Sequence, residues 1–147
     1  MKTIWNPADR EGLLLRFDKL TSDRRPAWGN MTAPQMIVHV ADPMKTALGE
    51  MAAPFKRGLF SNAVVRHFII YWSPWPKGAP TAPEYIHHES GDLEAGKAEL
   101  RKTLERFVAA GEDADHEPHP AFGRLSGRAW GRLTYRHLDH HLRQFQL

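Results

Sequence analysis

Apolar residues recur at helical spacing in several separate segments of the chain. The segments are residues 7–20, 32–51, 59–71, 91–110 and 126–145. In the first segment the apolar positions are Leu13, Leu14, Phe17 and Leu20. Intervals of three and four residues place such positions on one face of a helix. No stretch of useful length alternates apolar and polar residues as a strand would, so the pattern predicts an all-α fold.

Polar capping residues indicate where three of these helices begin. Asn6 precedes a proline, which suits the first turn of a helix. Thr32 is followed three residues later by Gln35, the spacing of a capping box. Ser126 stands at the start of the last segment. Pro43 lies inside the second segment, and we expect it to kink that helix or divide it.

One long connection separates the segments that end at residue 71 and begin at residue 91. It contains Pro74, Pro76, Pro80 and Pro83. That density of proline excludes a long helix, so residues 72–90 are predicted to form an extended strap across the end of a bundle. Four long helices with one long crossover indicate a four-helix bundle, and 147 residues suit a single domain spanning 1–147.

The chain contains no cysteine. Disulfide scaffolds, thiolate zinc sites, iron–sulfur clusters and a cysteine nucleophile are therefore excluded. Any bound transition metal has to be held by imidazole or oxygen ligands. Any thiol chemistry has to take its sulfur from a small molecule.

Charge and hydropathy suggest the compartment and the partners. The first residues lack the apolar run of a signal peptide, and the most apolar window, 63–72, is too short for a membrane helix. We therefore expect a cytoplasmic protein without a membrane partner. The formal charge is +3, and arginines recur every fourth residue at 124, 128, 132 and 136, so most of them would lie along one helix face. We interpret that face as a solvated surface and expect no nucleic-acid partner.

The candidate chemistry lies in the nine histidines. His137 and His141 are four residues apart, so they share a helix face, and both fall within its apolar stripe. Buried imidazoles need partners, and hydrogen bonds would satisfy this pair as well as a metal would. His39, on the apolar face of another helix, adds a third nitrogen. Bundle cores build metal sites in this way, and three histidines with a free coordination position are typical of catalytic sites.

Other titratable residues near these positions have less defined roles. Asp42 could orient His39 or bind the metal, although we interpret it as a surface carboxylate. His140 could support a ligand or be exposed, and Asp139 is expected to be solvated. His67 is expected in the core or at its boundary. Spacing does not decide whether four further histidines border the site or lie on the surface: His87, His88, His116 and His119.

Several segments resemble the DinB-like superfamily and, within it, the group called DUF1569. They are Trp28-Gly29-Asn30-Met31, Gln35-Met36-Ile37-Val38-His39, Pro74-Trp75-Pro76-Lys77-Gly78, His119-Pro120-Ala121-Phe122-Gly123, and Trp130-Gly131 with His137-Leu138-Asp139-His140-His141-Leu142-Arg143-Gln144-Phe145. These segments run through nearly the whole chain, and the last is the most specific.

The resemblance implies a four-helix bundle with a long crossover between the second and third main helices. It also implies a divalent metal, such as zinc, nickel or iron, held by His39, His137 and His141. Some DinB-like proteins are transferases or isomerases that use low-molecular-weight thiols. Many read His-Arg-Gly-Gln where this chain reads His141-Leu142-Arg143-Gln144, a departure that keeps the ligand but weakens the transfer of any one activity.

Three functions are compatible with the sequence. The first is a metal-dependent enzyme that acts on a small-molecule substrate. It would be either a thiol transferase, which uses a low-molecular-weight thiol, or a hydrolase. The second is a non-catalytic metal-binding, ligand-binding or stress-response protein, and the third is a bundle whose histidines are structural. A general base beside the metal would favour an enzyme, and His140 and Asp42 are the nearest candidates. A homodimer is compatible with each function. Metal affinity is expected to fall as the pH drops through the histidine range near 6.5.

Overall fold

The computed structural model describes residues 1–75, 77–78, 81–88 and 91–147. These residues form α-helices and two short 3₁₀ turns, with one isolated bridge between His119 and Gly123, which confirms the all-α prediction. The helices are α1 (Pro7–Asp18), α2 (Ala33–Ala47), α3 (Ala63–Tyr71), α4 (Leu93–Ala110) and α5 (Gly127–Gln144). The 3₁₀ turns are η1 (Leu59–Ser61) and η2 (Pro83–Tyr85).

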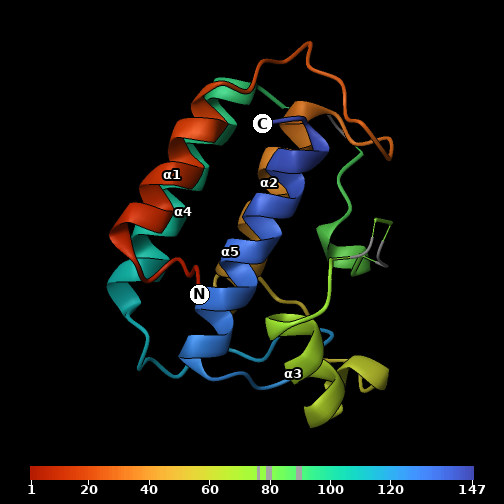
Figure 1. The fold of residues 1–147 in the computed structure, drawn as a ribbon, viewed down its shortest axis with the longest axis vertical. Helices are drawn as coiled ribbons and strands as arrows, with labels where there is room; N and C mark the ends of the chain where they lie inside the picture. The colour runs from red at the N-terminus through yellow and green to blue at the C-terminus, as the bar shows by residue number, and fades with distance from the viewer. Residues whose placement is uncertain (76, 79–80, 89–90) are drawn as a thin grey trace.

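The four longer helices lie side by side, and α3 lies beyond one end of them (Figure 1). Helix α2 packs against α4 and α5, and α1 packs against the same two helices. The shorter α3 contacts α5 and η1. Within the part of the chain that is described, no helix is both long enough and apolar enough to span a membrane.

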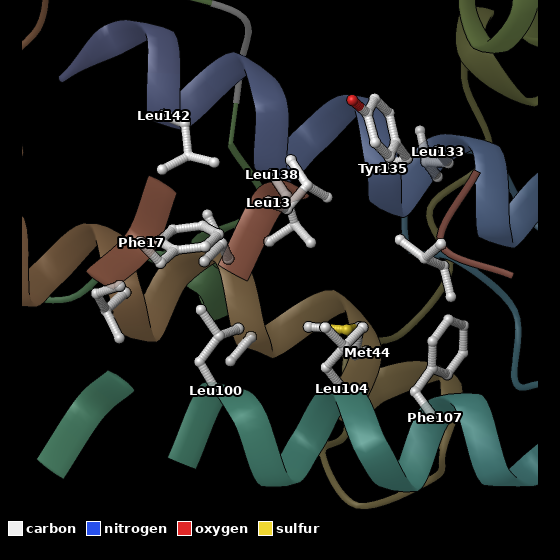
Figure 2. Close-up of a cluster of buried hydrophobic side chains, with 14 of the residues drawn as sticks. Leu13, Phe17, Met44, Leu100, Leu104, Phe107, Leu133, Tyr135, Leu138 and Leu142 are labelled. Carbon is white, nitrogen blue, oxygen red and sulfur yellow. The ribbon is translucent and has the colours of Figure 1, made fainter. Parts of the chain in front are cut away.

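A single apolar core fills the space between the longer helices (Figure 2). Phe17 comes from α1, Met44 from α2, Leu104 and Phe107 from α4, and Leu138 from α5, and all are buried. Burial of one such side chain contributes about 1.5–3 kcal/mol relative to its exposure to water. A core of this kind holds the helices together without help from a metal.

The helix starts follow the predicted caps. Asn6 accepts hydrogen bonds from two backbone N–H groups of the first turn of α1, and the capping box between Thr32 and Gln35 is present at the start of α2. Ser126 accepts a hydrogen bond from the backbone N–H of Ala129. These contacts satisfy N–H groups that have no partner within the helix.

Three details differ from the sequence-based expectation. Pro43 does not divide α2, because buried side chains on both sides of it pack against α4 and α5. That helix ends at Ala47 rather than residue 51, because Gly49 adopts a φ of +73° and ends the helical path. Residues 59–71 form η1 and α3 rather than one helix, because Asn62 caps the start of α3.

The strap contains no long helix among its described residues, as predicted. Its described residues include turns and the short η2, and Pro76 and Pro80 lie outside the described residues. Tyr85 fastens the strap to α2, since its hydroxyl donates a hydrogen bond of 2.9 Å to Oγ1 of Thr46. Burial raises the pKa of Tyr85 to about 12, so the phenol stays protonated and can donate this bond.

Candidate metal centre and the cavity beside it

The three histidines singled out in the sequence converge on one point. Nε2 of His39 in α2 lies 3.0 Å from Nε2 of His137 and 3.1 Å from Nε2 of His141, both in α5. The candidate ligand atoms of all three residues lie within 4.8 Å of one another, so the cluster could hold a metal ion. Because one ligand comes from α2 and two from successive turns of α5, the packing of these two helices sets the geometry.

Hydrogen bonds on the far side of two rings fix which nitrogen carries the proton. Nδ1 of His39 lies 3.1 Å from the carbonyl oxygen of Tyr85, and Nδ1 of His141 lies 2.8 Å from Oε1 of Gln144. The Gln144 amide is oriented by its own N–H, which donates to the carbonyl oxygen of Trp28 at 2.7 Å. Carbonyl oxygens only accept hydrogen bonds, so both Nδ1 atoms are protonated and both Nε2 atoms present lone pairs to the cluster.

Facing lone pairs at this separation fit a shared cation. Two nitrogens bound at 2.0–2.1 Å to a tetrahedral zinc ion lie about 3.3 Å apart, close to the distances in the cluster. Burial lowers the pKa of all three imidazoles: that of His39 falls, that of His137 falls well below its ordinary value, and that of His141 falls to about 3. Proximity to the other histidines lowers the last two further. The rings are therefore neutral near pH 7, which is the form that binds metals.

A cavity of about 700 Å³ opens beside the cluster. Side chains of α2, α5, the strap and the 119–122 turn line it, and most are apolar or aromatic. Trp75 of the strap stacks on His137, with ring centroids 5.8 Å apart and planes 19° apart. Lys77 lies over the Trp28 ring at 4.5 Å. Among the described residues, no aspartate or glutamate lines the cavity.

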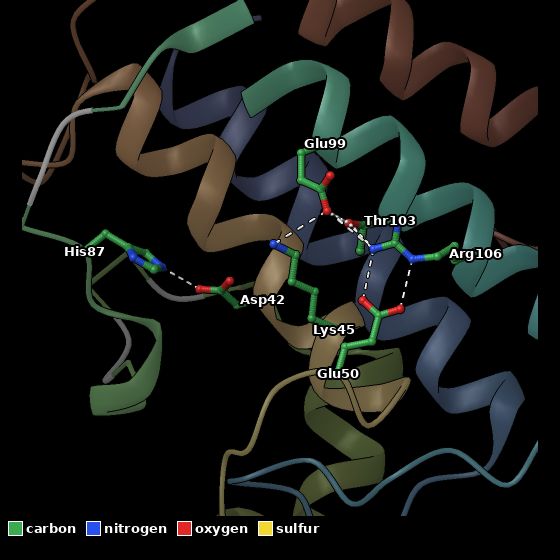
Figure 3. A network of polar contacts seen from close by, with 7 residues as sticks. All are labelled: Asp42, Lys45, Glu50, His87, Glu99, Thr103 and Arg106. Carbon is green, nitrogen blue, oxygen red and sulfur yellow. Dashed lines mark hydrogen bonds and ion pairs between the residues drawn. The ribbon is translucent and has the colours of Figure 1, made fainter. Parts of the chain in front are cut away.

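Asp42 is not the surface carboxylate that the sequence suggested. It is only 3% exposed, and its Oδ2 lies 2.5 Å from Nε2 of His87 in the strap (Figure 3). Burial raises the pKa of Asp42, and His87 opposes that shift. Asp42 therefore holds the strap against α2 and does not line the cavity. Sequence reasoning missed this contact because its two partners are 45 residues apart.

A separate polar network in Figure 3 joins α2 to α4 away from the histidines. Arg106 forms two contacts of 2.9 Å with the carboxylate of Glu50, and Lys45 lies 3.8 Å from Glu99. These pairs are largely exposed, so each contributes little to stability.

The other histidines divide between the cavity, the core and the surface. His140 lines the cavity between Trp28 and Trp75, with ring centroids 5.6 and 5.9 Å away. His119 also lines the cavity, whereas His116 is buried and donates from Nε2 to the carbonyl oxygen of Gly111. The prediction that His67 is in the core or at its boundary is wrong. His67 and His88 are both exposed, His67 because α3 packs through only one face.

Two further interpretations require correction. Asp139 is mostly buried and forms ion pairs of 2.7 Å with Arg16 and 2.9 Å with Arg143, so it is not simply solvated. Arg136 is not part of a solvated arginine face, because its guanidinium is partly buried and donates to the carbonyl oxygens of Ile69, Ile70 and Ser73. These carbonyls lie at and beyond the end of α3, where they have no helical partner.

Sequence reasoning also missed two cavity residues on α5, Trp130 and Thr134. A signal was present, because Trp130, Thr134 and His137 are separated by four and three residues and so share a helix face.

Comparison with known proteins identifies the family. The chain belongs to the family described as "Protein of unknown function (DUF1569)", whose model matches residues 14–147. A search of curated proteins found no match, and a search of solved structures found none either. The match covers all three clustered histidines and the cavity lining.

Proposed function

We propose that this chain is a DinB-like four-helix protein that binds a divalent metal through His39, His137 and His141 and uses it in chemistry on a small molecule. The preferred reaction is transfer of a low-molecular-weight thiol to an electrophile. Zinc, nickel and iron(II) each accept imidazole ligands and are the candidate metals.

The observation that carries the proposal is the cluster of Nε2 lone pairs beside the cavity. Tyr85 and Gln144 hold two of the rings in the metal-binding tautomer, as the hydrogen-bond partners of metal-bound histidines commonly do. Only three protein ligands are present within the described residues, and a site with three protein ligands leaves a coordination position free. A bound divalent ion would supply Lewis acidity and lower the pKa of a thiol or water at that position.

The cavity lining favours a thiol over water as the nucleophile. Metal-dependent hydrolysis commonly uses a carboxylate as general base, and the described lining contains none. A thiolate needs no such base once its proton has been lost. Trp75 stacks on His137, and the lining around the site is mainly apolar and aromatic.

The same lack of a carboxylate supports a second candidate, a non-catalytic metal-binding or ligand-binding protein. His140 is the remaining candidate base within the lining, and it is held between two tryptophans. If His140 has no role in turnover and no thiol is transferred, the second candidate is the better description.

The first test is calorimetric titration of zinc into metal-free protein at pH 7.5. Wild type is expected to bind one ion, and His137→Ala and His141→Ala are expected to lose most of the affinity while their far-ultraviolet circular dichroism stays helical. His88→Ala removes an exposed histidine and is the matched control. Binding by both cluster variants as tight as that of wild type would show that the three-histidine site is wrong.

The second test separates the two candidate functions. Wild type loaded with zinc, nickel or iron(II) is mixed with glutathione and 1-chloro-2,4-dinitrobenzene, and the thioether is followed by absorbance. Metal-dependent turnover that disappears in His137→Ala supports the transferase. Metal binding without turnover for a panel of thiols and electrophiles supports the non-catalytic alternative.

A further inference from the structure

Two of the described residues that line the cavity each carry a buried polar atom without a hydrogen-bond partner. Nε1 of Trp130 and Oγ1 of Thr134 are both unpaired within the described part of the chain. Trp130 is 0% exposed and Thr134 is 4% exposed, and both residues line the cavity. A buried donor without a partner opposes folding, so such atoms are rare and require an explanation.

Several nearby polar groups are paired, and the other unpaired buried atoms among the described residues, Oε2 of Glu84 and Nε of Arg132, belong to residues that do not line the cavity. The indole N–H of Trp5 is paired, since it donates to the carbonyl oxygen of Gly127 at 2.9 Å. Gln144, further along the same helix face, uses both its amide nitrogen and its amide oxygen. A threonine within a helix can donate to the carbonyl four residues earlier, but the Thr134 hydroxyl makes no such bond.

His119 adds a third donor next to Trp130, with ring centroids 5.4 Å apart. Its Nδ1 accepts hydrogen bonds from the backbone N–H groups of Ala121 and Phe122 at 3.1 and 3.3 Å. Nε2 must therefore carry the ring proton. Burial lowers the pKa of His119 to about 3, so the ring remains a neutral donor near pH 7.

We propose that Trp130, Thr134 and His119 form a recognition wall for the oxygen of an uncharged carbonyl compound, a ketone, quinone or amide with an apolar body. This inference rests on the proposed function, because it takes the cavity to be the substrate site beside the metal. Each of the three side chains can donate a hydrogen bond, and an acceptor oxygen that reaches any one of them would satisfy that donor.

The charge of the wall excludes an anion as its preferred occupant. None of the three donors is cationic, and a carboxylate moved there from water would lose its hydration without gaining a counter-charge. The cationic Lys77 does not offset this, because it lies over Trp28. Trp28 is near His140 and Gln144, at the other end of the α5 face from Trp130. The rest of the lining is mainly apolar and aromatic, which suits a hydrophobic body.

Helix geometry sets the length of the substrate. Thr134 and Trp130 precede His137 by three and seven residues, or about 4.5 and 10.5 Å along the axis at 1.5 Å per residue. A substrate that spans from the wall to the histidine cluster therefore has its carbonyl oxygen roughly 5–10 Å from the atom that reacts.

The first experiment observes the wall directly with three probes of similar size. The ¹⁵N–¹H spectrum of the tryptophan indoles is recorded during titration with 2-acetylnaphthalene, 2-ethylnaphthalene and 2-naphthoate. The Trp130 signal is assigned with Trp130→Phe. The ketone is expected to move the Trp130 signal further downfield than the hydrocarbon does, and the Trp5 signal, whose N–H is already bonded, is expected to stay in place.

The second experiment uses matched threonine variants. Thr134→Val removes an unpaired hydroxyl, so its folding stability should equal or exceed that of wild type, while its affinity for 2-acetylnaphthalene should fall about tenfold, the equivalent of one hydrogen bond. Its affinity for 2-ethylnaphthalene should not change. Thr103→Val removes the hydroxyl of another buried threonine, one bonded to Glu99 and outside the cavity, and should leave both affinities unchanged.

Three results would overturn the inference: equal affinity of wild type for the ketone and the hydrocarbon, tighter binding of 2-naphthoate than of the ketone, or an unchanged ketone preference in Thr134→Val. None of these three results bears on zinc binding, which is tested separately by the calorimetric titration. Loss of the zinc site with the ketone preference retained would instead contradict the proposed function alone.

Discussion

The partly buried His119 ring should make the stability of this protein depend on pH in a way that one substitution can isolate. The pKa of His119 falls from its ordinary 6.5 to about 3 in the folded protein because the ring is buried. Below pH 6.5 the unfolded chain therefore binds a proton at this position that the folded chain does not. Stability from this group is fully present above pH 6.5 and is lost as the pH falls below that value.

The size of the effect follows from that difference in pKa. Between pH 7 and pH 5, protonation of the unfolded form alone lowers the free energy of unfolding by about 2 kcal/mol for this one histidine. The figure depends little on the folded value, because any folded pKa below about 4 leaves the ring neutral at pH 5.

The assay is urea unfolding with EDTA present, on wild type and His119→Gln at pH 7.0 and 5.0. Glutamine does not titrate, so the variant should lose about 2 kcal/mol less than wild type over this interval, whatever the substitution costs at pH 7. The carboxylates and the other histidines make the same contribution to the pH dependence of unfolding in both proteins, so their contributions cancel in the difference. His88→Gln is the control for the loss of a histidine as such. Equal losses in wild type and His119→Gln would refute the assigned burial of a neutral ring.

Three further predictions concern packing, the anchoring of α3 and the metal. Gly131→Ala would place a Cβ 2.1 Å from Nε1 of Trp5, so thermal unfolding should show a loss of stability of about 1–3 kcal/mol. Gly12→Ala meets open space within a helix and should raise stability by about 0.5–1 kcal/mol. Equal effects of the two substitutions would contradict this packing. Arg136→Met removes the donor to the carbonyl oxygens of Ile69 and Ile70, so amide hydrogen exchange should accelerate in α3 but not in α4. Unchanged protection of α3 would show that another contact anchors it. Zinc affinity should fall between pH 7.5 and 6.0 by much less than the roughly 50-fold expected for three histidines of ordinary pKa, because burial lowers the pKa of all three ligands. Calorimetry that finds the full loss would contradict that burial.

The sequence by itself determined most of the helices and the three histidines that cluster. Helix starts could be predicted because a cap acts on N–H groups two or three residues away, as at Asn6 and Thr32. The pair His137 and His141 could be predicted because helical periodicity fixes which residues share a face. His39 followed from its place on an apolar face, since two apolar faces in one small core must meet.

Only the tertiary structure decided the surroundings of those histidines. The pairing of Asp42 with His87 and the bonds from Arg136 to the end of α3 join residues at least 45 positions apart, and no local pattern records such contacts. The exposed His67 shows the same limit, because a helix that packs through one face leaves even apolar neighbours in water. Helical spacing places Trp130 and Thr134 on the face that carries the ligands, although sequence reasoning did not use it. Whether their polar atoms are paired depends on what lies across from them, so only the fold left them without partners among the described residues.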